Sequence, residues 1–332
     1  MPAATRRLEL KIDVTALVAT AGPHTVAASV VLPPAGVALR ERLLFCLPGG
    51  AMTRDYFDLA VPGDASFSFA RSMAALGYPV AMVDHLGTGA SSVPADGFAL
   101  RIEEAVAANQ CALSHVRDAL RAGTLASGVP PVPGLRTVGV GHSMGGLLTV
   151  LQQAAGAGHD ALLLLGYSDN GLREALPPAA LAYADDPAGA RAALNELLRG
   201  WQSDAFFAMP AAAMARAVYR GGHIPEAAVQ ALEAVNTRTL GVGGLLAMIP
   251  GSAGPEMQSI DVPVFLGVGD RDIAGPPQRI PATLPRAPYL SLAVLPQTGH
   301  NHFVYPSRAL LLRLVANWLD VIDAFAAASA PP

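Results

Sequence analysis

Residues 137–146 read TVGVGHSMGG, an apolar strand-forming run that enters the pattern G-x-S-x-G and continues into a helix-forming stretch. A serine in so tight a strand-to-helix turn is crowded, and the positions two residues away, Gly141 and Gly145, have no room for side chains. The following helix directs its free N–H groups and the positive end of its dipole toward the serine oxygen. The pattern predicts that Ser143 is a nucleophile. With 33 glycines in the chain, the alternative is a glycine-rich turn without chemistry.

A partner acid for this serine is expected at the end of a later strand, because a nucleophile of this kind is followed along the chain by an acid and then a histidine. Residues 263–269 are a continuous apolar run, typical of a buried parallel strand, and Asp270, Arg271 and Asp272 follow directly. We predict Asp272 as the acid and keep Asp270 as its alternative. Asp169 closes the apolar run 161–168 and is a third candidate, with capping of the next segment as its competing role.

The predicted base follows the last β-rich run, residues 289–295, which leads into PQTGHNHF. A histidine near the C-terminus can take the serine proton while a buried carboxylate fixes its tautomer. We predict His300 as the general base. His302 is the alternative, or else a residue that supports the site or contacts the substrate.

Two backbone N–H groups are expected to hold the negative charge that develops on a carbonyl oxygen. The first belongs to Met144, directly after the serine. The second is expected in the loop PGGA that follows the strand 43–47. Because a glycine lets the backbone approach a substrate closely, we predict the N–H of Gly50, with Ala51 as the alternative.

These motifs, in this order, resemble the α/β-hydrolase family. Residues 83–91, VDHLGTGAS, look like the family's D-x-x-G-x-G-x-S loop, and residues 298–300, TGH, look like its histidine loop. The resemblance implies an α/β fold with a mostly parallel, eight-stranded type of sheet flanked by helices, and hydrolysis without a cofactor or metal. Pro48 departs from the pattern, because many members carry histidine there. Ser143 argues against haloalkane dehalogenases and epoxide hydrolases, which use an aspartate at this position.

Between residues 169 and 260 the strand pattern stops and alanine-rich helical segments follow at 188–198, 205–220 and 225–234. The resemblance implies a lid inserted at this point. We therefore predict a core domain of residues 1–169 and 258–332 and a helical cap of residues 170–257. The candidate side chains for the substrate pocket are His142, His302, Trp201, Phe206, Met209 and Met248.

Composition limits the partners. The chain has 332 residues, 52% of them hydrophobic, which is enough for a large core, and its net charge of -4 gives no basic surface for nucleic acid. Two cysteines are too few for a disulfide framework or a zinc site. No apolar run approaches the roughly 20 residues of a membrane span, and the N-terminus alternates like a strand instead of a signal peptide, so we expect a cytoplasmic protein. Lys11 is the only lysine, which argues against Schiff-base and Ser-Lys mechanisms.

The sequence thus predicts a serine hydrolase that cleaves a carboxylic ester or lactone of a hydrophobic small molecule through an acyl-enzyme. An acyltransferase, a thioesterase or a C–C bond hydrolase would use the same residues. A hydrolase-fold protein that binds an apolar ligand without turnover is the alternative outside catalysis. The pattern carries no information on the oligomeric state.

Overall fold

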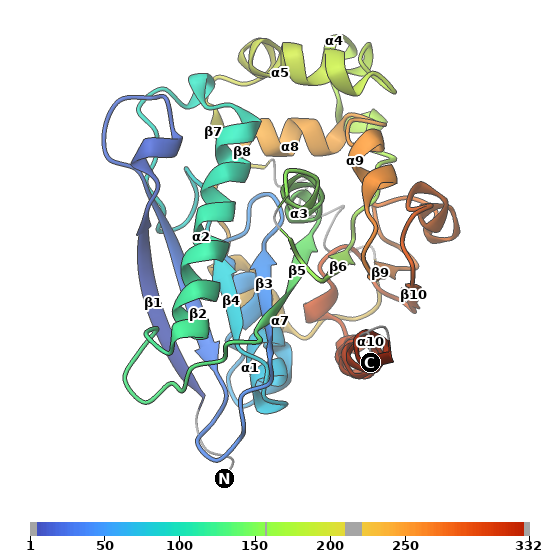
Figure 1. Cartoon of the computed structure of the whole chain (residues 1–332). Helices are drawn as coiled ribbons and strands as arrows, with labels where there is room; N and C mark the ends of the chain where they lie inside the picture. Colours follow the sequence, from blue (N-terminus) through green and yellow to red (C-terminus); the bar gives the residue numbers. More distant parts are fainter. Residues whose placement is uncertain (1–4, 157, 210–220, 329–332) are drawn as a thin grey trace.

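A single eight-stranded sheet organises the protein (Figure 1). The computed structural model describes residues 5–156, 158–209 and 221–328. The strand order is β1-β2-β4-β3-β5-β6-β9-β10. Strand β2 is antiparallel to both of its neighbours and every other pair is parallel. The mostly parallel sheet is thus confirmed, and its strands are β1 (Arg6–Asp13), β2 (Thr25–Leu32), β3 (Arg42–Leu47), β4 (Val80–Val83), β5 (Arg136–His142), β6 (Ala161–Leu165), β9 (Val264–Gly269) and β10 (Leu290–Leu295).

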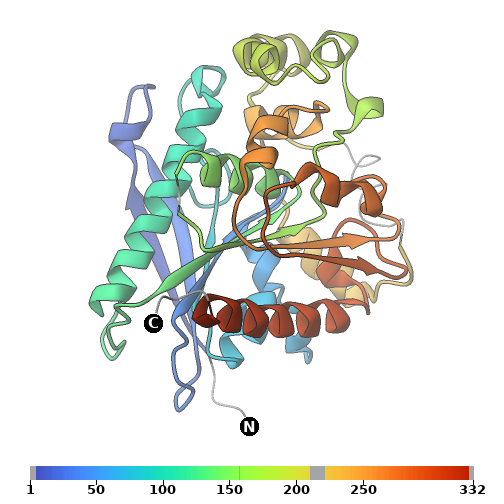
Figure 2. The same ribbon diagram turned by 45° about the vertical axis from the view of Figure 1, so that its right-hand side comes forward.

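The central strands are apolar throughout because both faces of the sheet are covered. In β3, side chains alternate between two buried clusters: Leu43, Phe45 and Leu47 join one, and Leu44 and Cys46 join the other. Figure 2 shows the two layers of helices on opposite faces of the sheet. One layer contains α2 (Ile102–Ala122) and α3 (Met144–Ala154), and the other contains α1 (Phe69–Ala75) and α10 (Arg308–Ala328).

The segment between β6 and β9 is largely helical. Helices α4 and α5 lie at the end of the molecule away from both termini, and α8 lies between α5 and α3 (Figure 1). Helix α7 instead packs into the cluster on the α10 face through Ala228 and Leu232. The elements of this segment are α4 (Pro178–Leu181), α5 (Pro187–Trp201), β7 (Phe206–Phe207), α7 (Glu226–Ala234), β8 (Thr239–Leu240), α8 (Gly241–Met248) and α9 (Gly254–Ser259).

The helix predicted over residues 205–220 is wrong at its start. Phe206 and Phe207 form a short strand that pairs antiparallel with β8, because aromatic side chains favour a pleated conformation and the Asp204 carboxylate accepts the Phe206 N–H. The rest of that prediction, residues 210–220, lies outside the described residues. The division of the chain into a core and a cap stays a prediction.

Candidate active site

Ser143 stands in a strained turn between β5 and α3. Its backbone has φ 54° and ψ -122°, a region that a residue with a side chain rarely adopts. A Cβ atom on Gly145 would lie 2.0 Å from the Leu47 carbonyl oxygen, and one on Gly141 would lie 2.4 Å from the Gly145 oxygen. The turn therefore needs glycine at both positions, as the crowding argument from the sequence expects.

His300 and Asp272 form a buried pair beside this turn. The His300 Nδ1 donates to Asp272 Oδ1 over 2.6 Å, and the side chains are 8% and 0% exposed. The N–H of Ala274 adds a donor at 3.1 Å to the same oxygen. Burial would raise the pKa of Asp272, but the charge and hydrogen bonds of its histidine neighbours hold that pKa well below its usual value. Asp272 is thus an ionised carboxylate that orients the His300 ring.

Room for this pair is provided by Gly166, the residue after β6. Its φ is +57°, and a Cβ atom there would lie 3.0 Å from His300 Nδ1 and 3.1 Å from Asp272 Oδ2. Any larger residue would press on the pair. The sequence analysis did not single out Gly166, although its place directly after an apolar strand beside Asp169 is a signal that could have been used.

The two alternative acids lie elsewhere. The Asp270 carboxylate accepts the N–H groups of Gln297 and Thr298, both over 2.9 Å, and so shapes the histidine loop. The Asp169 carboxylate accepts the Ala253 N–H over 3.0 Å. No hydrogen bond to a histidine is found for either carboxylate among the residues that the structure describes. Asp169 thus binds at the start of α9 and does not cap the segment that directly follows it, the competing role considered from the sequence.

The loop after β3 faces the same site. Gly50 lines the cavity next to Ser143, whereas Ala51 does not. Ala51 is turned away with φ 63°, and its carbonyl oxygen accepts the Thr237 N–H over 2.9 Å. The His85 Nε2 bonds to the Pro48 carbonyl oxygen over 3.0 Å and so steadies the loop. Of the two candidates for the second oxyanion donor, Gly50 is the one that lines the same cavity as Met144, the first residue of α3.

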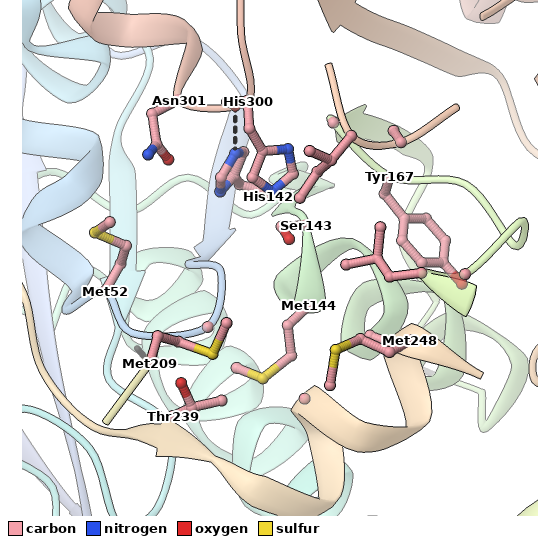
Figure 3. A pocket seen from close by; sticks show the side chains of 18 of the residues that line it. Met52, His142, Ser143, Met144, Tyr167, Met209, Thr239, Met248, His300 and Asn301 are labelled. Atoms are coloured by element: carbon pink, nitrogen blue, oxygen red, sulfur yellow. Dashed lines mark hydrogen bonds between the residues drawn. The ribbon is translucent and has the colours of Figure 1, made fainter. Parts of the chain in front are cut away.

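His142 lies between Ser143 and the histidine loop. Its Nε2 donates to the His300 carbonyl oxygen over 2.9 Å, as the dashed line in Figure 3 marks. Its ring centre is 4.5 Å from that of Tyr56. Burial, followed by the charges of His300 and His302, holds the pKa of His142 well below its usual value, so the ring is neutral. His142 therefore supports the backbone of the predicted base.

A cavity of about 110 Å³ opens at Ser143 (Figure 3). Methionine side chains form much of its wall, and Met144, Met209 and Met248 gather on the side away from His300. None of the described lining residues is Asp, Glu, Lys or Arg. The lining residues are Gly50, Met52, His142, Ser143, Met144, Gly166, Tyr167, Ser168, Gly171, Leu172, Phe207, Met209, Thr239, Gly244, Ala247, Met248, Ile273, Ala274, His300 and Asn301.

Three of the predicted pocket side chains are not part of this cavity. Phe206 points to the opposite side of its strand from Phe207, and a Cβ atom on Gly87 would lie 1.9 Å from its ring. Trp201 packs edge-on against Phe207, with ring centres 5.5 Å apart. His302 is fully buried and donates from Nε2 to Asp272 Oδ2 over 2.8 Å. His142, Met209 and Met248 do line the cavity.

The sequence analysis missed several of the lining side chains, among them Met52, Tyr167, Thr239 and Asn301. Asn301 is 2% exposed, and Figure 3 shows its amide turned into the cavity. The hydroxyl oxygens of Thr239 and Tyr167 are buried without a hydrogen-bond partner among the described residues. Asn301 lies between His300 and His302 in the histidine loop, and this position could have indicated that it is near the site. Thr239 lies in an inserted segment without one.

The described part of the chain contains neither a group of side chains suited to a metal ion nor a helix that could span a membrane. No group of three or more His, Cys, Asp or Glu side chains there could hold a metal ion, and no helix there is both long and apolar enough to cross a bilayer. Cys46 and Cys111 are both free thiols.

Comparison with known proteins identifies the family of this protein. A model of the alpha/beta hydrolase family matches residues 44–311, and the protein belongs to this family. No curated protein matches the sequence significantly.

Solved structures share the fold at low sequence identity. A thermophilic esterase from Thermogutta terrifontis has a TM-score of 0.59 and 16% identity, covering 95% of this chain and 99% of that one. A peroxisomal alpha-beta-hydrolase from Saccharomyces cerevisiae has a TM-score of 0.59 and 15% identity, covering 97% and 89%. The thioesterase domain from the curacin biosynthetic pathway has a TM-score of 0.56 and 17% identity, covering 94% and 99%.

Proposed function

We propose that the protein is a serine hydrolase that cleaves a carboxylic ester or lactone of a small, uncharged, hydrophobic molecule. The observation that carries this proposal is that the turn around Ser143 and the predicted base His300 face one cavity. Ser143 is held in a strained turn at the N-terminus of α3, and His300, hydrogen-bonded to Asp272, borders the same cavity. Strain of this kind is retained where a side chain must be presented in one geometry.

In the proposed mechanism, Ser143 Oγ attacks the carbonyl carbon while His300 Nε2 takes its proton. The carbonyl oxygen becomes an oxyanion that accepts hydrogen bonds from the N–H groups of Met144 and Gly50. When the bond to the leaving oxygen breaks, the imidazolium of His300 gives its proton to that oxygen and the acyl-enzyme remains. Water, deprotonated by His300, then attacks the acyl carbon and releases the acid and free Ser143.

The lining of the cavity supports the choice of substrate. A charged group buried in a wall without a charged partner would be strongly unfavourable, and the described lining offers no such partner. The methionine wall suits an apolar group of irregular shape, because thioether side chains adapt to their neighbours. A volume of about 110 Å³ favours a short acyl group over a long fatty acyl chain. Asn301 would bind an uncharged polar group near the carbonyl.

A chain-length series of p-nitrophenyl esters tests the proposal, with Ser143→Ala as the inactive variant. Ser252→Ala is the matched control, because Ser252 is a buried serine whose hydroxyl donates to the Leu246 carbonyl oxygen outside the cavity. We expect turnover of short-chain esters by the wild type and by Ser252→Ala, and none by Ser143→Ala. If no ester is turned over, the hypothesis of ester hydrolysis is wrong. The alternatives are then an acyltransferase, a thioesterase, a C–C bond hydrolase or a ligand-binding protein.

A cytoplasmic location stays a prediction.

A further inference from the structure

Asp272 receives a hydrogen bond from a second imidazole in addition to that of His300. His300 Nδ1 donates to Oδ1 over 2.6 Å, and His302 Nε2 donates to Oδ2 over 2.8 Å. The Gly269 N–H makes a weaker contact of 3.4 Å with Oδ2. Each oxygen of the carboxylate therefore has its own imidazole donor, and the two histidines come from the same loop.

We propose that His302 is a positioning residue that shares the charge of Asp272 and thereby sets how strongly Asp272 holds the protonated form of His300. This inference rests on the proposed role of His300 as the base. A carboxylate that accepts hydrogen bonds from two imidazoles stabilises each of them less than it would stabilise a single donor. With His302 in place, only part of the Asp272 charge faces the Nδ1 proton of His300.

The surroundings of His302 argue against a role in packing alone. The side chain is 0% exposed, and its Nδ1 has no hydrogen-bond partner among the described residues. A buried polar atom without a partner is unfavourable, and an apolar residue of similar size would avoid that loss. The bond from Nε2 to Asp272 is the feature that an apolar residue could not provide.

The titratable groups that face His302 come from several elements. Asp272 follows β9, and His300 precedes His302 in the loop after β10. The His142 ring, at the end of β5, stands edge-on with its centre 5.8 Å away. Tyr56, whose hydroxyl lies beside the His302 backbone, faces it from the loop after β3 and is itself near Tyr305. Burial, followed by the charge of Asp272, raises the pKa of Tyr56, so this hydroxyl stays neutral. Asp272 is the carboxylate of this group.

The variants His302→Gln and His302→Asn provide a matched pair. Both carry the same amide, but only glutamine is long enough to place an N–H group where Nε2 donates to Asp272. His159→Gln is the control for a buried histidine elsewhere, because His159 bonds to Thr137 Oγ1 over 3.1 Å and does not line the cavity.

The first readout is the pH dependence of kcat/KM on the best p-nitrophenyl ester. We expect the acidic limb of His302→Asn to move upward by roughly half to one pH unit, since one donor to a charged group is lost. His302→Gln should remain close to the wild type, and His159→Gln should not move the limb. If His302→Asn and His302→Gln lower the melting temperature alike and neither moves the limb, His302 is a packing residue and the inference is wrong.

The second readout does not depend on turnover. Low-field proton NMR should show two N–H protons bonded to Asp272 in the wild type. In His302→Asn one should disappear and the His300 proton should move further downfield, because the whole charge of Asp272 then faces it. In His302→Gln the His300 proton should stay near its wild-type position. If the wild type hydrolyses no ester, the proposed function fails, yet an unmoved His300 proton in His302→Asn would still refute this inference separately.

Discussion

The ends of the sheet strands and the segment inserted between β6 and β9 contribute different kinds of side chain to the same cavity. The strand ends supply groups fixed by hydrogen bonds, such as His142 and His300. The inserted segment supplies mostly apolar side chains, such as Leu172, Phe207, Met209, Ala247 and Met248. Its lining side chains with a hydroxyl group are Tyr167, Ser168 and Thr239. Under the proposed function, the ends of the strands would carry out the chemistry, whereas the segment between β6 and β9 would select the molecule that fits. The two properties should respond to different mutations.

The largest effect is expected at the acid of the proposed triad. Asp272→Asn should lower kcat on the best ester by on the order of 10³ to 10⁴ with little change in KM, because an amide can hold His300 in the wrong tautomer. Asp270→Asn is the matched control, because Asp270 lies two residues away and, among the described residues, its carboxylate accepts from N–H groups of the histidine loop. Steady-state kinetics gives kcat and KM for both variants. Equal losses in the two would mean that loop geometry, and not Asp272, governs the rate.

A second comparison uses glycine in the two regions. Gly145→Ala should destabilise the fold by about 3 kcal/mol or more, since the new methyl group meets the backbone oxygens of Leu47 and Pro48 at 2.0 and 2.6 Å. Gly200→Ala in α5 has nothing within 4 Å and should be neutral or slightly stabilising. Urea denaturation with circular dichroism measures both. A Gly145→Ala protein as stable as the wild type would show that the turn is not crowded.

A third prediction concerns substrate choice. Met248→Ala enlarges the cavity and should shift the preference in kcat/KM toward a longer acyl chain by on the order of tenfold, because each methylene contributes roughly 1–3 kcal/mol to discrimination. Met257→Ala is the control: Met257 is a fully buried methionine of α9 that does not line the cavity. It should lose stability without changing the preference. A chain-length profile unchanged in Met248→Ala would contradict the assignment of the inserted segment to selectivity.

The smallest effect is expected at Asp169, where the inserted segment meets β6. Burial, opposed by the Ala253 N–H and helped by the charges of Glu256 and Asp185, raises the pKa of Asp169 to about 6. The folded state therefore binds this proton more tightly than the unfolded state, and the carboxylate destabilises the fold increasingly as the pH rises from about 4 to about 6. Asp169→Asn should gain about 1–2 kcal/mol at pH 8 and almost nothing at pH 4. Denaturation at both pH values measures this gain, and an equal gain at the two would exclude a protonation effect.

Much of the sheet could be predicted because its strands are short apolar runs that each end in a motif. Ser143 and Asp272 were predicted in this way, since each follows a run that is buried on both faces. His300 was predicted from its motif after β10, an edge strand that is only partly buried. The choice between Asp272 and Asp270 depends on which carboxylate turns inward. That orientation is a property of the loop and not of the sequence pattern.

The inserted segment was harder to predict, because its residues share a helical composition whichever way they face. Phe206 and Phe207 are both buried aromatics, and only their pairing with β8 decides that Phe207 turns to the cavity. His302 presents the same difficulty: its spacing from His300 indicated proximity, but the bond to the far oxygen of Asp272 is a tertiary contact.

Covalent labelling of the nucleophilic serine tests the central claim most directly. The protein would be treated with a fluorophosphonate, which reacts with an activated serine, and the labelled peptide would be identified by mass spectrometry. We predict a single adduct on Ser143, with Ser143→Ala unlabelled and Ser252→Ala labelled as fast as the wild type. An adduct on another residue, or ester hydrolysis that persists in Ser143→Ala, would contradict the account.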